Sequence, residues 1–159
     1  DIDLIEVTNE DITLVGLSNS SSVDHMAEIY SFDNNGFLPL DTMFFNSRPN
    51  TIKFFNQQDE SISVAVGLSE GGGCYIELLD PNGKIIQNSN RLHIANGYSV
   101  LDVEVVEDQI LLSLGINGVQ VYSLEGVFIK GIVSGHAYSS SMFKNSYIVG
   151  TKNGIEVYN

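Results

Sequence analysis

The chain has 159 residues, of which 43% are apolar and 17% charged, so it carries enough apolar surface to fold around a sizeable core. Twenty acidic against seven basic residues give a formal net charge of −13, which argues against nucleic acid as a partner because phosphate backbones bind cationic surfaces. The one cysteine, Cys74, excludes an intrachain disulfide, and no apolar run approaches the roughly 20 residues of a membrane span.

The chain contains an internal repeat. The motif Val15-Gly16-Leu17-Ser18 recurs as Val66-Gly67-Leu68-Ser69, and weaker copies stand at Leu114-Gly115 and Val149-Gly150. After each of the first three copies a second apolar segment ends in a glycine turn, at 34–36, 81–83 and 124–126. A repeat of roughly this length is typical of an architecture built from successive supersecondary units.

In chain order, each unit is predicted to contain consecutive antiparallel strands. The expected strands are 2–8, 12–17 and 29–33; then 51–56, 62–68, 76–80 and 84–87; then 100–106, 110–115, 119–123 and 127–133; and finally 147–150 and 155–158. The second strand of each unit is almost continuously apolar, which predicts burial on both faces. Asn-Gly pairs at 117–118 and 153–154 predict type I′ turns. No segment has the periodicity of a helix.

Four-stranded units in tandem are typical of β-propeller blades. We therefore expect an all-β chain, a propeller or partial propeller of about 3.5–4 blades. The expected blades cover approximately 1–47, 48–90, 91–134 and an incomplete 135–159, and form a single segment. The segment 2–8 is expected to be the first strand of the first blade. Because open sheet edges favour pairing, we also expect a longer parent protein or a second chain to complete the ring.

Several segments resemble known propeller repeats. Ser134-Gly135-His136 followed by 147–159 resembles a WD-type repeat, with Tyr-Asn in place of Trp-Asp. The segment 115–122 is similar to the LVIVD repeat, and 15–37 resembles epitempin-type repeats and lactonase-type propellers. These resemblances imply a propeller whose role is mostly the non-catalytic binding of ligands or proteins.

The repeat also predicts two chemically unequal faces, because alternate connections between strands emerge on opposite sides of a blade. The connections 18–26, 46–50, 69–74, 89–98 and 134–138 share one face, which holds every histidine and both arginines. We predict a binding or scaffold module, without cofactor or metal, that binds a protein, small molecule or glycan on this face. The candidate binding residues are Asp24, His25, Arg48, Glu70, Arg91, His93, His136 and Lys152.

Two alternatives stay open. A lactonase-like or sugar-active hydrolase would use Asp24, His25, His93 or His136 as acid, base or metal ligand on the same face. A purely structural role, in which the chain only completes a ring, is the other. The glycine-rich stretch 71–73 has no Gly-Lys-Ser/Thr sequence and no following helix, so we interpret it as a loop rather than a phosphate site.

Overall fold

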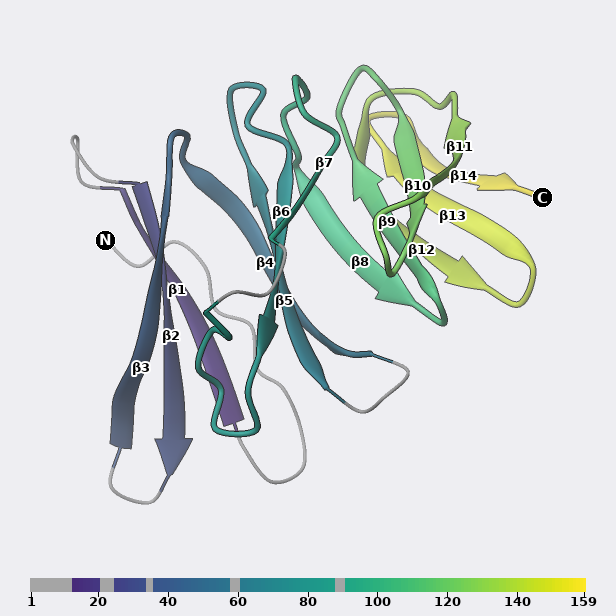
Figure 1. The fold of residues 1–159 in the computed structure, drawn as a ribbon. Coiled ribbons are helices and arrows are strands. Elements are labelled where there is room, and N and C mark those ends of the chain that lie inside the picture. The colour runs from purple at the N-terminus through teal and green to yellow at the C-terminus, as the bar shows by residue number, and fades with distance from the viewer. Residues whose placement is uncertain (1–12, 21–24, 34–35, 58–60, 88–90) are drawn as a thin grey trace.

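The computed structural model describes residues 13–20, 25–33, 36–57, 61–87 and 91–159. Within these residues all regular elements are β-strands, which confirms the all-β prediction. They form four antiparallel sheets that follow one another in chain order (Figure 1). No helix in the described part of the chain is long and apolar enough to cross a membrane.

Each sheet is a simple meander of sequential strands. The first contains β1 (Thr13–Ser20), β2 (His25–Asp33) and β3 (Gly36–Phe45), and the second contains β4 (Pro49–Asn56), β5 (Ile62–Leu68), β6 (Cys74–Leu79) and β7 (Leu92–Ile94). The third contains β8 (Asp102–Val106), β9 (Gln109–Ser113), β10 (Val119–Ser123) and β11 (Phe128–Ile132), and the fourth contains β12 (Ala137–Phe143), β13 (Ser146–Thr151) and β14 (Gly154–Tyr158). The predicted strand 2–8 lies outside the described residues.

Apolar side chains fill the three spaces between successive sheets. In the second sheet, Val64 and Val66 of β5 pack towards the first sheet, while Ala65 packs towards the third. In the third sheet, Leu112 faces the second sheet and Leu111 faces the fourth. The middle strands are therefore buried on both faces, as their continuous apolar runs predict.

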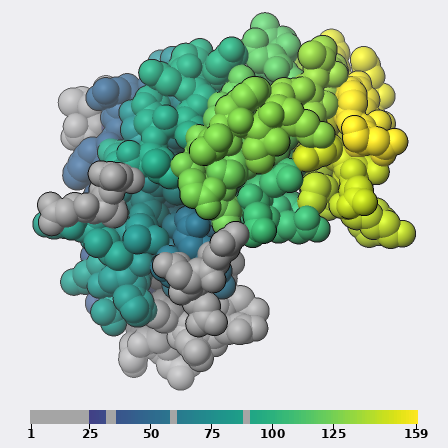
Figure 2. All heavy atoms as spheres, turned by 45° about the vertical axis from the view of Figure 1, so that its right-hand side comes forward, coloured from purple at the N-terminus to yellow at the C-terminus, as the bar shows by residue number. Residues whose placement is uncertain are grey.

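The first strands of three sheets lie along one inner edge of the molecule. The strand β8 contacts both β4 and β12, the corresponding strands of the neighbouring sheets. Figure 2 shows the third sheet in green beside the fourth in yellow, with the fourth at the rim of the molecule. Residues on this inner edge are distant in sequence but close in space.

One strand of the second sheet lies elsewhere than predicted. The outer strand was expected at 84–87, but the strand that pairs with β6 is β7, at Leu92–Ile94. Residue Ile85 makes only an isolated bridge to Leu79. Two backbone hydrogen bonds accompany this bridge, from the Asp80 N–H to the Lys84 carbonyl and from the Ile86 N–H to the Leu78 carbonyl, and the Ile85 N–H donates to Asp41 Oδ2 of the first sheet at 3.0 Å. The second sheet consequently ends at Ile94, beyond the expected boundary at residue 90.

Candidate functional site

Backbone hydrogen bonds hold the connections at one end of the sheets together. The Ser69 N–H donates to the Arg48 carbonyl at 2.8 Å, and the Gly97 N–H donates to the Gly71 carbonyl at 2.9 Å. Between the third and fourth sheets, Gly115 and Ala137 exchange two backbone hydrogen bonds, at 2.9 and 3.1 Å. We call this surface the loop face; it comprises the connections 46–48, 69–73, 95–101, 114–118, 133–136 and 152–153.

Four candidate binding residues lie on the loop face. Arg48, Glu70 and Lys152 are exposed there, and His136 is half-buried. The connections of Arg48 and Glu70 are joined by the Ser69–Arg48 hydrogen bond, and His136 and Lys152 are next in sequence to Ala137 and Thr151, which pair across β12 and β13. Asp24 lies outside the described residues.

Arg91 precedes β7 and His93 lies on it, and both are exposed. His93 Nε2 is 2.9 Å from the carbonyl oxygen of Gly72, a residue of the loop face. The Arg91 guanidinium lies 4.1 Å from the Tyr75 ring centre and 4.9 Å from that of Phe45, and its Nε donates to Glu77 Oε1 at 2.8 Å. The His93 ring stacks on Tyr75 with centres 4.0 Å apart. Burial raises the pKa of Glu77, and the Arg91 charge offsets part of that rise. We call Phe45, Tyr75, Glu77, Arg91 and His93 the Arg91 cluster; it joins β3 to the outer part of the second sheet.

His25 stands beside the Arg91 cluster. It begins β2 and is the register partner of Phe45 on β3. Register partners point to the same face of a sheet, so His25 faces the second sheet together with Phe45. Its Nδ1 is buried and has no hydrogen-bond partner among the described residues.

His136 lies over the connection between β9 and β10. A side chain added at Gly115 would place its Cβ 3.1 Å from His136 Nε2, and the His136 ring is 4.7 Å from that of Tyr138. Gly115 has a φ of +59°, a left-handed conformation that glycine adopts without a steric penalty. This glycine therefore allows the imidazole to sit directly on the neighbouring connection.

The sequence analysis did not identify the exposed apolar residues of the loop face. Ile116 is 81% exposed and Val133 is 91% exposed, and both lie on connections of the loop face. Tyr138 is also half exposed beside His136. An apolar residue inside the Gly-Ile-Asn-Gly turn was the available signal, because turns are usually polar. We call Ile116, Val133, His136, Tyr138 and Lys152 the loop patch.

The described histidines belong to different sheets or their connections. His25 belongs to the first sheet, His93 to the second, and His136 precedes the fourth. Among the described residues, no group of three or more His, Cys, Asp or Glu side chains is placed to hold a metal ion. The hydrolase alternative stays a prediction.

No family model matches the chain, and no curated protein matches it. Solved structures are similar in fold. The computationally designed Ika4 protein matches with a TM-score of 0.71 and 12% identity over 99% of this chain and 90% of its own. BBS1N in complex with ARL6DN matches with a TM-score of 0.68 and 15% identity over 99% of this chain.

The match with BBS1N defines the class of fold. BBS1N is a β-propeller, and the chain spans about half of it, since the alignment covers 52% of the BBS1N chain. The designed Ika8 protein matches with a TM-score of 0.66 and 13% identity over 99% of this chain and 45% of its own. With four successive antiparallel sheets, the chain has a β-propeller-like fold.

Proposed function

We propose that this chain is a non-catalytic binding or scaffold module of a larger β-propeller protein, with a protein partner bound on the loop face. The observation that carries the proposal is the loop patch, in which strongly exposed Ile116 and Val133 stand on connections held by backbone hydrogen bonds. Exposed apolar side chains on a rigid scaffold favour association because docking removes them from water without a large ordering cost.

Charge indicates the chemistry of the partner. The chain has a net charge of −13, yet the loop face carries Arg48, Lys152 and His136 with one carboxylate, Glu70. Charges that are complementary across an interface accelerate association and select the partner. We therefore expect an acidic partner surface with an apolar centre. BBS1N was solved in complex with ARL6DN, which gives a propeller with a protein partner as precedent for this fold.

Replacement of Val133 by aspartate is expected to reduce partner binding at least tenfold. The charge would lie in the apolar part of the interface and would add to the negative charge of the chain, and a tenfold loss corresponds to about 1.4 kcal/mol. The matched control is Val127→Asp: Val127 is 64% exposed at the turn between β10 and β11, at the opposite end of the strands. Quantitative affinity capture from extracts of the source cells, followed by titration of the captured proteins, measures both variants.

A partner should bind wild type and Val127→Asp alike and be lost from Val133→Asp. Equal binding by all three proteins would place the interface elsewhere, and loss from both variants would indicate nonspecific capture by apolar surface. Circular dichroism melting curves of the two variants should be similar, because both side chains are exposed.

We also propose that further blades or a second chain pack on the outer face of the fourth sheet. Ile148 is the register partner of Val157, and Gly150 that of Ile155, so the three apolar side chains share one face. Tyr147 and Val149 are buried on the opposite face, against the third sheet. Ile155 is 76% and Val157 64% exposed, which leaves an apolar stripe on an edge sheet.

The 159-residue chain by itself is therefore expected to associate through this stripe. Light scattering at increasing concentration should give a mass above the 17.4 kDa of one chain. Lysine in place of both Ile155 and Val157 should return the mass to that of one chain, because charged edge residues oppose sheet pairing. A wild-type chain that stays monomeric at high concentration would contradict this proposal.

A further inference from the structure

Each of the four sheets contains an equivalent strand in which two alternate apolar residues point away from the preceding sheet. These strands are β2, β6, β10 and β14; β2 and β6 follow copies of the Val-Gly-Leu-Ser motif, and β10 and β14 begin at Asn-Gly pairs. In the first three sheets both residues are at most 3% exposed and are buried against the next sheet: Ala27 and Ile29, Cys74 and Ile76, Val119 and Val121. The equivalent residues of β14, Ile155 and Val157, are 76% and 64% exposed. The fourth sheet therefore exposes the pair that the other three sheets bury.

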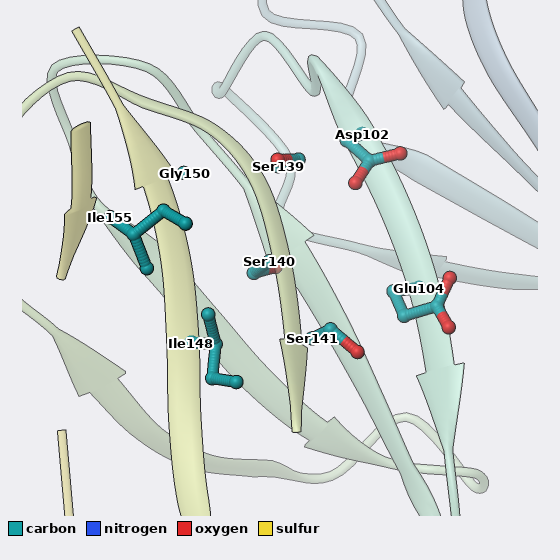
Figure 3. Close-up of a pocket in the computed structure, with 8 residues that line it drawn as sticks. All are labelled: Asp102, Glu104, Ser139, Ser140, Ser141, Ile148, Gly150 and Ile155. Carbon is teal, nitrogen blue, oxygen red and sulfur yellow. The ribbon is translucent and has the colours of Figure 1, made fainter. Parts of the chain in front are cut away.

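The outer face of the fourth sheet extends this exposed pair onto β13. Figure 3 shows Ile148 and Ile155 on this face, with the serines of β12 beside them. Together with Asp102 and Glu104 of β8 they line a groove of about 400 Å³, which we call the acidic groove. The Lys53 Nζ lies 3.4 Å from Glu104 Oε2, so this carboxylate is paired within the chain. The outer face of the fourth sheet is thus apolar on β13 and β14 and polar towards the inner edge of the molecule.

The first sheet has a second exposed apolar face, at the other end of the row of sheets (Figure 1). Ile29 packs against the second sheet, so its neighbour Tyr30 points the other way. Phe44 of β3 also points away from the second sheet, because the residues on both sides of it pack there. Phe44 is 63% exposed, and Phe37, whose ring centre lies 6.3 Å from that of Tyr30, is 59% exposed. We call the surface formed by Tyr30, Phe37 and Phe44 the outer face of the first sheet.

A recurring tyrosine contact indicates what such a face packs against. In the third and fourth sheets the tyrosine hydroxyl donates to the side chain two residues earlier, Tyr122 to Gln120 at 2.6 Å and Tyr158 to Glu156. Both tyrosines pack against the preceding sheet. Tyr30 makes the same contact with Glu28: burial, followed by the charge and the hydrogen bond of Glu28, raises the pKa of Tyr30. Tyr30 therefore occupies the position at which the later sheets meet a preceding sheet.

We infer that a second copy of this chain covers both exposed faces, with the outer face of the fourth sheet of each copy packed on the outer face of the first sheet of the other. The inference rests on the proposed packing of a second chain on the fourth sheet, and it names the surface that packs there. Each of the three spaces between successive sheets joins these same two kinds of face, and the described residues leave one of each kind exposed. Two copies would make two more such contacts and would remove both apolar faces from water.

The two faces differ, so the copies pair head-to-tail, and such pairing ends in a closed ring only where the copies together complete one turn. The chain aligns with 52% of the chain of BBS1N, a β-propeller, so two copies together match about the length of that protein. We therefore expect a closed pair of chains related by a two-fold axis. An open head-to-tail array would instead keep adding copies.

The first test is the mass of the 159-residue chain in solution, measured by light scattering at increasing concentration. The mass should rise to twice 17.4 kDa and stay there, because a closed pair has no face left to add a third copy. A mass that continues to rise would overturn the closed pair.

The second test changes each face separately and then mixes the variants. Phe44→Glu alters the first sheet, and Ile155→Lys combined with Val157→Lys alters the fourth; each protein alone should have a dissociation constant of the pair at least tenfold above that of the wild type. An equimolar mixture should again form pairs, since one contact then joins two unchanged faces and the other brings glutamate towards lysine. The matched control is Val127→Glu, at an exposed turn outside both faces, which should pair like the wild type.

The mixture also controls for folding, because a misfolded variant would not recover its partner, and circular dichroism of each variant checks this directly. If Phe44→Glu still pairs while the lysine variant does not, the fourth sheets pack on each other, and the inference fails although the proposed packing on the fourth sheet stands. A wild-type chain that stays monomeric would overturn both. Neither result bears on the loop patch, whose partner binding is measured separately.

Discussion

Gly118→Ala is expected to lower the free energy of unfolding by about 3 kcal/mol, the sum of a left-handed backbone penalty of about 1 kcal/mol and an overpacking cost of about 2 kcal/mol. Gly118 has a φ of +75° and lies where the connection between β9 and β10 meets the one that leads to β12. A Cβ there would be 2.2 Å from the Ile132 carbonyl oxygen and 3.3 Å from the Ser134 nitrogen. Both contacts are with backbone, which cannot move aside as a flexible side chain would.

The matched control is Gly97→Ala. Gly97 has a φ of +89°, but no atom lies within 4 Å of the Cβ that alanine would add. Its substitution therefore measures the backbone penalty alone, about 1 kcal/mol. Urea unfolding followed by circular dichroism gives both values. Equal destabilisation by the two variants would show that the two connections do not approach as closely as this.

Gly118 also connects stability to the loop patch. A forced separation of the two connections would displace Ile116 from Val133, since each belongs to one of them. Partner binding should weaken in Gly118→Ala even at temperatures where the variant is folded. Gly97→Ala, on another connection of the loop face, should bind the partner like the wild type.

Sequence alone could predict the parts of the fold that depend on neighbouring residues. The apolar runs of β5 and β9 place these strands in the middle of their sheets, because only two-sided burial favours such runs. The acidic groove could not be predicted in this way. It forms where Asp102 on β8 faces Ile148 and Ile155, some 46 to 53 residues later, and nothing local in the sequence specifies that these strands meet.

The turn types expected from the Asn-Gly pairs also differ from those in the structure. Neither Asn117 nor Asn153 has the positive φ that a type I′ turn needs, so that prediction is wrong at both Asn-Gly pairs. In the connection that contains the first pair, the residues with a positive φ are Gly115 and Gly118, and the Gly115 backbone is hydrogen-bonded to Ala137. The connection that is hydrogen-bonded to the next sheet covers 114–118, and Ile116 is exposed at its tip.

The Arg91 cluster shows that residue type alone does not predict the contacts that a side chain makes in the fold. Arginine and histidine on a predicted loop favoured a ligand site, and that prediction stands. The structure adds that His93 lies on β7 of the second sheet and that Arg91 contacts Glu77 and Tyr75. That arrangement depends on which of two segments becomes the outer strand. The Ile85 N–H donates to Asp41 of the first sheet, a contact between sheets that the local sequence does not predict.

Arg91→Ala is expected to destabilise the fold by about 2 kcal/mol at pH 8. Glu77 is only 8% exposed, and removal of its partner leaves a buried carboxylate without compensation. The full cost of such a change is about 3–5 kcal/mol when both groups are buried, and it is smaller here because the Arg91 side chain is 35% exposed. Thermal and urea unfolding at fixed pH measure the loss, and Lys152→Ala, at an exposed turn, should change stability by less than about 0.5 kcal/mol.

The pH dependence identifies the cause. Burial raises the pKa of Glu77 above 4.5 in the fold, so the folded chain holds this proton more tightly, and the Glu77 contribution to stability falls as pH rises through the folded pKa. Without Arg91 that pKa rises further. The destabilisation by Arg91→Ala should therefore be largest at pH 8 and shrink near pH 4, where Glu77 is protonated and only the contacts with Tyr75 and Phe45 are lost.

Two further variants complete the test. Glu77→Gln combined with Arg91→Ala should be more stable at pH 8 than Arg91→Ala alone, because the uncompensated charge is gone. Arg91→Lys should fall between wild type and Arg91→Ala, since lysine keeps the charge but not the planar group that stacks on Tyr75. A loss of stability that is equal at pH 4 and pH 8, or that Glu77→Gln leaves unchanged, would contradict the pairing of these two residues.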